Sequence, residues 1–488
     1  MHQHRHIQWR LIGKLLGMLF MMLALPISIS VVWAVLDQEW MPAIAITGSS
    51  MISLSAGLLL WFSNKRYDHR NISINEGYLI VTLTWFSMSV LGALPFFLSG
   101  SIPSFTDAFF ESISGFTTTG ASILQDIESI SRGLLFWRSM THWLGGMGII
   151  VLTLAILPIL GVGGMQLFVA EVPGTTPTRL HPRITHTAKR LWGIYVGLTT
   201  VQTVLLMLGG MDFFHSINHA FSTVATGGFS TQNDSIASYT PYIQYIIIVF
   251  MMLAGVSFTM HYFLIKRQFK QLLGNEELKF YFLIILTCTL ILTISILTLD
   301  HYGLEQAFRE SMFQVVAITT TTGFVTTNYL QWPGQSWFLL FILMFTGGCI
   351  GSTGGGIKMI RIWVLIKNTR LEIQRLVHPM AVIPLKLDGK VIPQNVTTNF
   401  LAFVFLYVLL VFTGAAVMMG YGLDFASAAG ASIATIGNIG PAIGSVGPVE
   451  NYAHIPTGGK WFLSFFMLLG RLELFTVLLL LSPSFWKR

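Results

Sequence analysis

The sequence predicts an all-α polytopic membrane protein, in which four span–half-helix–span repeats with pseudo-fourfold symmetry follow two N-terminal transmembrane helices. The first observation is composition: 53% of the 488 residues are hydrophobic and only 10% are charged, whereas soluble domains are about 25% charged. The second is a recurring apolar stretch, too short to cross a bilayer, that ends in threonine and glycine. The third is that this stretch always falls between two long apolar runs.

Apolar runs of about 20 residues mark the spans. Ten are expected, at about 11–36, 41–63, 77–100, 134–160, 191–211, 242–265, 280–299, 337–366, 399–423 and 461–483. The first run contains Lys14 and Pro26 and lacks an A-x-A-type site, so we expect a retained helix rather than a cleaved signal. Glycines interrupt the eighth span.

The short apolar stretch defines the repeat. Its copies are DAFFESISGFTTTG at 107–120, the looser FHSINHAFSTVATG at 214–227, ESMFQVVAITTTTG at 310–323 and DFASAAGASIATIG at 424–437. They divide the chain into two leading helices at 1–70 and four repeats at 71–185, 186–275, 276–392 and 393–488. Half-helices that each end in a Thr/Gly loop indicate four linings of one pore, so the repeats are span–pore-helix–span units.

Charge predicts the orientation. Most Lys and Arg fall in every second inter-span segment, which places those segments and both termini in the cytoplasm. The half-helices then enter from outside, where acids such as Asp107 and Glu111 outnumber bases and would concentrate cations. The basic segments 179–190 and 358–375 are candidate docking faces, with topology and lipid-headgroup contact as the alternative. No basic–aromatic interleaving indicates nucleic-acid binding.

The four Thr/Gly loops suit a dehydrated monovalent cation. Backbone carbonyls can replace its water without a fixed negative charge, so the ion can also leave. Glycine permits the unusual backbone angles that this requires, and threonine adds stiffness and a hydroxyl. A half-helix also turns the negative end of its dipole toward the cation. The candidate filter residues are Thr118, Thr119, Gly120, Ala225, Thr226, Gly227, Thr321, Thr322, Gly323, Thr435, Ile436, Gly437 and Asn438.

In these motifs the chain resembles the Trk/Ktr/HKT superfamily of potassium transporters, and most of all its bacterial TrkH/TrkG-type membrane subunits. The matching motifs are ISGFTTTGAS at 113–122, FSTVATGGFST at 221–231, ITTTTGF at 318–324, ATIGNIGP at 434–441 and FTGGCIGSTGGGIK at 345–358. The resemblance covers nearly the whole chain, and the two leading spans resemble the extra N-terminal helices of the TrkH branch.

The resemblance implies that four glycines bind K⁺ through their backbone carbonyls. These filter glycines are Gly120, Gly227, Gly323 and Gly437. Some sodium-preferring plant relatives carry serine at the first of these positions, so Gly120 favours potassium.

The glycine-rich break in the eighth span is the candidate gate. It comprises Thr346, Gly347, Gly348, Cys349, Ile350, Gly351, Ser352, Thr353, Gly354, Gly355 and Gly356. Six glycines disfavour a continuous helix. The stretch is not a phosphate loop, because Ile357 and Lys358 follow its last glycine. The resemblance implies an intramembrane gate below the filter, and a packing loop without a gating role is the alternative.

Arg471 is a charge within the last span, where ionisable residues are costly and usually functional. We expect it to pair with carbonyls of the candidate gate and to place an electrostatic barrier in the permeation path, a role that the resemblance supports. A structural ion pair at a helix interface is the alternative. Glu473 is only two residues away, so the two side chains should point in different directions.

Other candidate sites are weaker. His215 and His219 have the i, i+4 spacing of metal ligands, but no third ligand is obvious, so a packed pair is favoured. Cys288 and Cys349 lie in apolar runs and are expected to be buried small residues. No dyad or triad has catalytic spacing, so we expect neither an enzyme nor a cofactor in this chain, with K⁺ as the transported ion.

These observations predict potassium uptake through a single-chain pore, in the cytoplasmic (inner) membrane of a bacterium. A potassium symporter coupled to protons or sodium is the alternative, although few acids lie in the spans. An intramembrane enzyme and a structural scaffold are more distant alternatives. The resemblance implies a homodimer and a cytoplasmic TrkA-like regulatory subunit with nucleotide-binding domains. Membrane lipid is the other expected partner.

Overall fold

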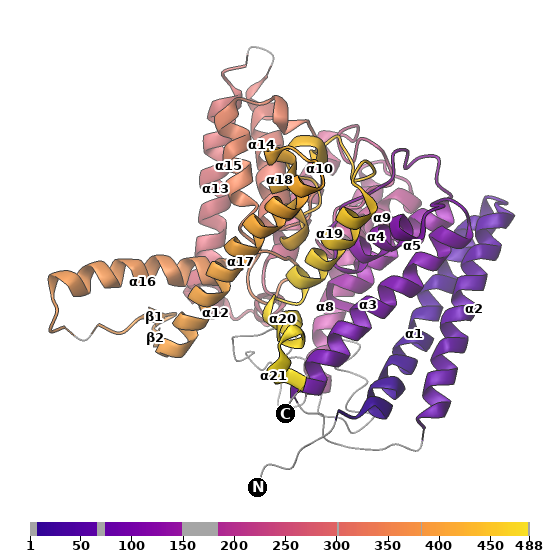
Figure 1. Ribbon diagram of the computed structural model, residues 1–488. Coiled ribbons are helices and arrows are strands. Elements are labelled where there is room, and N and C mark those ends of the chain that lie inside the picture. The colour runs from indigo at the N-terminus through magenta and orange to yellow at the C-terminus, as the bar shows by residue number, and fades with distance from the viewer. Residues whose placement is uncertain (1–6, 66–73, 149–183, 300–301, 382, 487–488) are drawn as a thin grey trace, which may run out of the picture.

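The computed structural model describes residues 7–65, 74–148, 184–299, 302–381 and 383–486, and it is almost entirely helical (Figure 1). Within that part of the chain, six helices are long and apolar enough to cross a membrane, or seven if one bent pair counts as a span. The six are α1 (Trp9–Leu36), α2 (Trp40–Ser63), α3 (Ile74–Leu98), α8 (Ile184–Leu208), α13 (Glu276–Ile296) and α17 (Gln394–Gly420). Their positions agree with six of the ten expected spans.

The first two helices pack against each other along their length (Figure 1). A Cβ atom built at Gly17 would lie 2.7 Å from the backbone oxygen of Gly57, and the reverse distance is also 2.7 Å. The hydroxyl of Ser53 on α2 donates to the Phe20 carbonyl of α1 at 2.8 Å. Small residues that let two backbones touch are typical of helix packing in membranes.

Four short helices lie in the half of the bundle away from the start of α1 (Figure 1). They are α4 (Phe105–Phe116), α9 (Phe213–Val224), α14 (Leu304–Thr319) and α18 (Phe425–Ile436), so the expected half-helices are present. Side chains cap three of them: Ser104, Asp212 and Asp424 each accept a backbone N–H of the first turn. Most residues of these helices are buried, unlike the lipid-facing long helices.

The second helix of the second, third and fourth repeats is interrupted, and this differs from the sequence prediction, which interrupted only the eighth span. In the first repeat, α5 (Arg132–Trp143) passes into the π-helical turn η1 (Leu144–Gly148), and the rest of the expected 134–160 span lies outside the described residues. In the second, α10 (Pro241–Gly255) and α11 (Phe258–Ile265) meet at 102°.

The second helix is also interrupted in the third and fourth repeats. In the third, a glycine-rich loop (residues 344–358) separates α15 (Gly334–Leu343) from α16 (Met359–Val377), which extends to one side of the bundle (Figure 1). In the fourth, α19 (Thr457–Arg471) and α20 (Phe475–Leu481) are separated at Glu473 and Leu474, whose φ angles are 55° and 54°. The continuous spans expected at 242–265 and 461–483 are therefore wrong, because a mean apolar character does not reveal a break in the hydrogen-bond ladder.

The remaining elements are small. They are α12 (Phe269–Gly274), α21 (Pro483–Trp486), the 3₁₀ turns η2 (Tyr329–Gln331) and η3 (Gly444–Val446), and an antiparallel hairpin of β1 (Lys386–Leu387) and β2 (Lys390–Val391). The start of α1, the hairpin and α21 lie toward the same end of the bundle (Figure 1). The repeat boundaries stay a prediction, and residues 179–183 of the candidate docking face at 179–190 lie outside the described residues.

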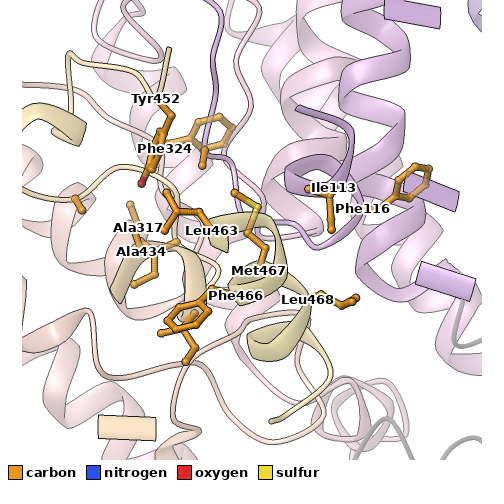
Figure 2. Packing of buried hydrophobic residues seen from close by; sticks show 14 of the residues in the cluster. Ile113, Phe116, Ala317, Phe324, Ala434, Tyr452, Leu463, Phe466, Met467 and Leu468 are labelled. Carbon is orange, nitrogen blue, oxygen red and sulfur yellow. The ribbon is translucent and has the colours of Figure 1, made fainter. Parts of the chain in front are cut away.

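Apolar side chains of several repeats meet in one core around the short helices (Figure 2). Ile113 and Phe116 come from α4, Ala317 from α14 and Ala434 from α18, and all four are at most 2% exposed. Met467 of α19 belongs to the same core. This packing fixes where the four short helices end, which positions the loops described next.

The α1–α2 contact gives a test of close helix packing. We expect Gly57→Leu to lower the unfolding free energy by about 1–3 kcal/mol, because the new side chain meets the backbone of α1. The control is Gly48→Leu on the same helix, where a Cβ atom meets nothing within 4 Å. Thermal melting in detergent measures the difference, and equal melting temperatures for the two variants would contradict the packing argument.

Candidate functional site

The chain leaves each short helix with the same backbone conformation. One residue past the C-cap has a left-handed φ: Thr118 at 52°, Thr226 at 55°, Thr321 at 59° and Asn438 at 53°. Two residues later comes a glycine with positive φ: Gly120 at 78°, Gly228 at 81°, Gly323 at 76° and Gly440 at 98°. We name the four segments loop 1 (residues 117–120), loop 2 (225–228), loop 3 (320–323) and loop 4 (437–440).

This register corrects two of the expected filter glycines. Gly228 and Gly440, rather than Gly227 and Gly437, are the structural equivalents of Gly120 and Gly323. Gly437 is the C-cap of α18 and has a φ of −79°. The sequence prediction matched the four copies by the glycine that ends each one. The residue at which each short helix ends decides which glycine is the structural equivalent.

Other expected filter residues shift with that register. Thr435 and Ile436 belong to the last turn of α18, and Ala225 is the C-cap of α9. Gly227 is the equivalent of Thr119 and Thr322, and Asn438 is the equivalent of Thr118. The expected residues of loops 1 and 3 lie where the sequence placed them.

The four loops close into a ring through contacts between a glycine and the next loop's backbone. A Cβ atom built at Gly120 would collide with the carbonyl oxygen of Gly227, one at Gly228 with Thr322, one at Gly323 with Ile439, and one at Gly440 with Thr119. Each of these oxygens belongs to the residue before the equivalent glycine. Glycine is therefore required at these four positions by space as well as by φ.

Threonine pairs support two of the four loops. In loop 1 the Thr117 and Thr119 hydroxyl oxygens are 2.7 Å apart, and Thr117 donates to the Ile113 carbonyl at 2.6 Å. In loop 3 the equivalent oxygens of Thr320 and Thr322 are 2.8 Å apart. Loops 1 and 3 are opposite each other in the ring, so the side-chain support has twofold rather than fourfold symmetry.

Side-chain links also tie the outer flanks of loops 1 and 2. The buried Glu111 carboxylate accepts from Arg138 at 2.6 Å, and Arg138 donates to the Ser230 carbonyl at 2.8 Å. Further out, Asn233 donates to Asp126 at 3.0 Å, and this hydrogen bond lowers the pKa of Asp126. The charge of Glu111 is therefore compensated by Arg138 inside the protein. The sequence prediction placed Glu111 on the outer surface among acids that would concentrate cations, and the buried ion pair does not agree with that role.

The glycine-rich loop lies against the side of the ring at which the short helices α9 and α14 end. Its Gly355 N–H donates to the Thr321 hydroxyl at 2.7 Å, and Thr353 donates to the Val224 carbonyl at 3.0 Å. A Cβ atom at Gly354 would lie 2.8 Å from the carbonyl oxygen of Thr320. Within the loop, Gly347 N–H donates to the Ile357 carbonyl at 2.8 Å, which closes its base. The break in the eighth span thus contacts the end of α9 and loop 3, and a Cβ atom at Gly355 would also collide with the Gly437 carbonyl of loop 4.

Arg471 joins this loop to the ring. Its guanidinium donates to the Thr353 carbonyl at 2.8 Å and to the Thr118 hydroxyl at 3.2 Å. It also donates to the Gly145 and Gly146 carbonyls at 2.5 and 2.8 Å, at the π-helical end of α5. Glu473 points elsewhere and forms a buried ion pair with Arg361 of α16. The expected contact between Arg471 and carbonyls of the candidate gate is present.

A family model described as a cation transport protein, TrkH, matches residues 42–488. The chain belongs to the TrkH family. The TrkH of Halomonas elongata, a Trk system potassium uptake protein, is 40% identical over 98% of this chain and 99% of its own. The protein of that name from Escherichia coli K12 is 41% identical over 91% of this chain and 92% of its own. The crystal structure of the potassium transporter TrkH from Vibrio parahaemolyticus has a TM-score of 0.88 at 37% identity, covering 98% of this chain and 100% of that one.

Family membership agrees with the expected class of the molecule. A TrkH-family chain is a multi-pass, all-α membrane protein, and the family and the relatives above are transport proteins rather than enzymes. Their coverage extends over all four repeats, so the ring, the glycine-rich loop and Arg471 all lie inside the matched region.

The histidine pair of this TrkH-family chain makes ordinary polar contacts. His215 lies 2.6 Å from the Thr231 hydroxyl, and His219 lies 3.1 Å from that of Ser230. Among the described residues, no group of three or more His, Cys, Asp or Glu side chains is placed to hold a metal ion. Cys288 and Cys349 are both buried, as expected.

Sequence reasoning missed Glu277 as a candidate functional residue, and it did not predict which group Asn438 contacts. Glu277, at the start of α13, accepts backbone N–H groups from the glycine-rich loop and from α16. Asn438 donates to the Thr119 hydroxyl of loop 1 at 2.9 Å. An acid that begins an apolar span was an available signal for Glu277, whereas nothing in the sequence shows which loop Asn438 reaches.

The register of loop 4 is testable in this TrkH-family chain by comparing two glycines. We expect Gly440→Ala to reduce cation uptake about tenfold or more, because alanine is strained at a φ of 98° and its Cβ would meet the Thr119 carbonyl at 2.7 Å. Gly437→Ala should lose less uptake, because its φ of −79° suits alanine, although its Cβ would meet the Ile433 carbonyl at 2.8 Å. Ion flux into proteoliposomes measures both, and a greater loss in Gly437→Ala would show that the register is wrong.

Proposed function

We propose that this chain takes up potassium through the ring of four loops, with one pore in each chain. The observation that carries the proposal is the closed ring, in which every loop presents a backbone carbonyl beside the glycine of its neighbour. The printed names of the relatives, potassium uptake proteins of the Trk system, support K⁺ as the ion. Carbonyl rings of this kind can replace the hydration shell of a monovalent cation.

In the proposed filter, each loop contributes three residues in the corrected register. They are Thr118–Gly120, Thr226–Gly228, Thr321–Gly323 and Asn438–Gly440. The carbonyls of Thr119, Gly227, Thr322 and Ile439 form one layer of ligands. The C-terminal ends of the four short helices face the same ring and add a negative potential, which favours a cation. No cofactor is part of this proposal, and K⁺ is the cargo.

The proposed gate is the glycine-rich loop with Arg471. The loop contacts the ring through Gly354 and Gly355 and the end of α9 through Thr353, on the side where an ion would leave the filter. Arg471 adds a positive charge beside Thr118 at the same level. A cation passing the ring would meet both a steric and an electrostatic barrier, so conduction requires the loop to move away.

Passive conduction is favoured over coupled symport by the state of the buried acids. Glu111 and Glu473 are paired with arginines, Glu277 accepts backbone N–H groups, and Glu310 accepts from Gln306 at 2.8 Å. A proton relay needs acids that can exchange protons along the path. Reversal potentials measured against separate K⁺, Na⁺ and H⁺ gradients test this: a dependence on the proton or sodium gradient would favour the symporter.

The assembly and location are part of the proposal. The Trk system named for the relatives supports association with other Trk components. We include a homodimer, a cytoplasmic TrkA-like nucleotide-binding subunit, and the bacterial inner membrane with both termini in the cytoplasm. Potassium uptake by a deficient host that expresses this chain, with and without such a subunit, tests the function directly. No restored growth in either case would contradict it.

A neutral replacement of Arg471 tests whether its positive charge, rather than its hydrogen bonds, limits K⁺ flux. We expect Arg471→Gln to raise K⁺ flux through the unregulated protein several-fold, because the amide keeps a donor for the Thr353 carbonyl but removes the positive charge. The matched control is Arg361→Gln, which removes a buried arginine that pairs with Glu473 instead. Flux from proteoliposomes measures both. Unchanged flux in a folded Arg471→Gln protein would remove Arg471 from the gate.

A further inference from the structure

Glu277 occupies a position that transport through the ring does not by itself require. It lies in the first turn of α13, and only 4% of its surface is exposed. A carboxylate buried in an apolar span is costly unless hydrogen bonds or charges compensate it. Its neighbour Glu276 is directed elsewhere and accepts from Trp363 at 2.8 Å and from Lys367 at 2.5 Å. The two adjacent acids therefore serve different parts of the molecule.

One oxygen of Glu277 accepts two backbone N–H groups. The donor in the glycine-rich loop is Ile350, at 2.7 Å, and the donor in the first turn of α16 is Ile360, at 3.2 Å. The second is one of the N–H groups at a helix start that have no partner within the helix. Hydrogen bonds to a charged acceptor are about twice as strong as neutral ones.

The two donors flank the part of the loop that touches the ring. Between Ile350 and Ile360 lie Thr353, Gly354 and Gly355, which contact the end of α9 and loops 3 and 4. The loop cannot leave the ring as a unit unless one of the two N–H groups moves away from Glu277. Backbone bonds to α10 and α11 add to this: Cys349 N–H donates to Gly255 at 2.8 Å and Phe258 N–H to Gly351 at 3.0 Å.

We propose that Glu277 is the positioning residue that holds the glycine-rich loop against the ring, through its two bonds to Ile350 and Ile360. The inference rests on the proposed function and adds the residue that sets the resting state of the gate. Glu276 ties the same turn of α13 to α16 and, through the Asp388 N–H at 3.1 Å, to the β1–β2 hairpin. These partners of Glu276 all lie outside the glycine-rich loop.

The test compares two neighbouring glutamates in the full-length protein. We expect Glu277→Gln to raise K⁺ flux about tenfold in proteoliposomes without any added subunit, because the amide oxygen holds the two N–H groups less strongly. Glu276→Gln is the matched control, with the same chemistry one residue away and no bond to the loop. It should change flux less than about twofold. The K⁺ to Na⁺ ratio should stay the same in both, because neither residue contacts the ring.

Hydrogen exchange gives a second readout that does not depend on transport. Amides at 344–361 should exchange faster in Glu277→Gln but not in Glu276→Gln, whereas a general loss of stability would speed exchange in all helices. Equal exchange in the two variants, or equal flux in them, overturns the inference. If Glu277→Gln does not fold, Glu277→Asp keeps the charge but shortens the reach, and it should show the same changes to a smaller degree.

The two proposals fail in different ways. Absence of K⁺ flux in the wild-type protein and in both variants contradicts the proposed function, and the exchange experiment then still decides whether Glu277 holds the loop. Normal wild-type flux with an unchanged Glu277→Gln contradicts only the role of Glu277.

Discussion

The close approach of each loop glycine to its neighbour's carbonyl is the contact on which the rest of the site depends. Three such contacts join loops that are consecutive in sequence, and the fourth joins loop 4 back to loop 1 and closes the ring. Backbone that leaves helical geometry inside a membrane is tolerated only where protein or a water-filled path surrounds it. The short helices meet this condition, because they are almost entirely buried by the long helices around them.

Interruption of the second helix in repeats two to four, and the π-helical turn that follows α5, are consistent with the same constraint. A helix that ends inside the protein leaves carbonyl and N–H groups without partners. Here the carbonyl groups at such positions accept hydrogen bonds from the glycine-rich loop and from Arg471. The Gly255 carbonyl accepts from the Cys349 N–H, and a carbonyl of the π-helical turn after α5 accepts from Arg471. The breaks are therefore what allows one loop and one arginine to be held at the centre of the molecule without an opposing carboxylate for every charge.

Sequence reasoning located the large features and missed those that depend on register and contact. Apolar runs and the repeated Thr/Gly ending were enough to place the short helices, the glycine-rich break and Arg471. They could not distinguish Gly437 from Gly440, because the choice depends on where α18 ends, which its packing decides. The bend between α10 and α11 was also hidden, since a single Gly255 in an apolar run does not predict a 102° turn.

Loops 2 and 4 contain fewer threonines than loops 1 and 3, and the structure shows a physical reason for this difference. Where loops 1 and 3 hold their shape with hydroxyl pairs of their own, loops 2 and 4 are held from outside. Gly227 packs against the imidazole of His142, which stacks on Phe229 with ring centroids 4.0 Å apart. Asn438 donates to the Met467 carbonyl of α19 at 2.9 Å.

The external supports of loops 2 and 4 belong to α5 and α19, and Arg471 connects the end of α19 to the end of α5. A shift of those helices would therefore act on two opposite loops, while the hydroxyl pairs keep the other two in shape. The ring thus combines two self-supported loops with two that depend on the helices around the proposed gate. This arrangement gives a route by which the proposed gate can act on the proposed filter. The close contacts between neighbouring loops explain why glycine, rather than threonine, is the residue that all four loops share.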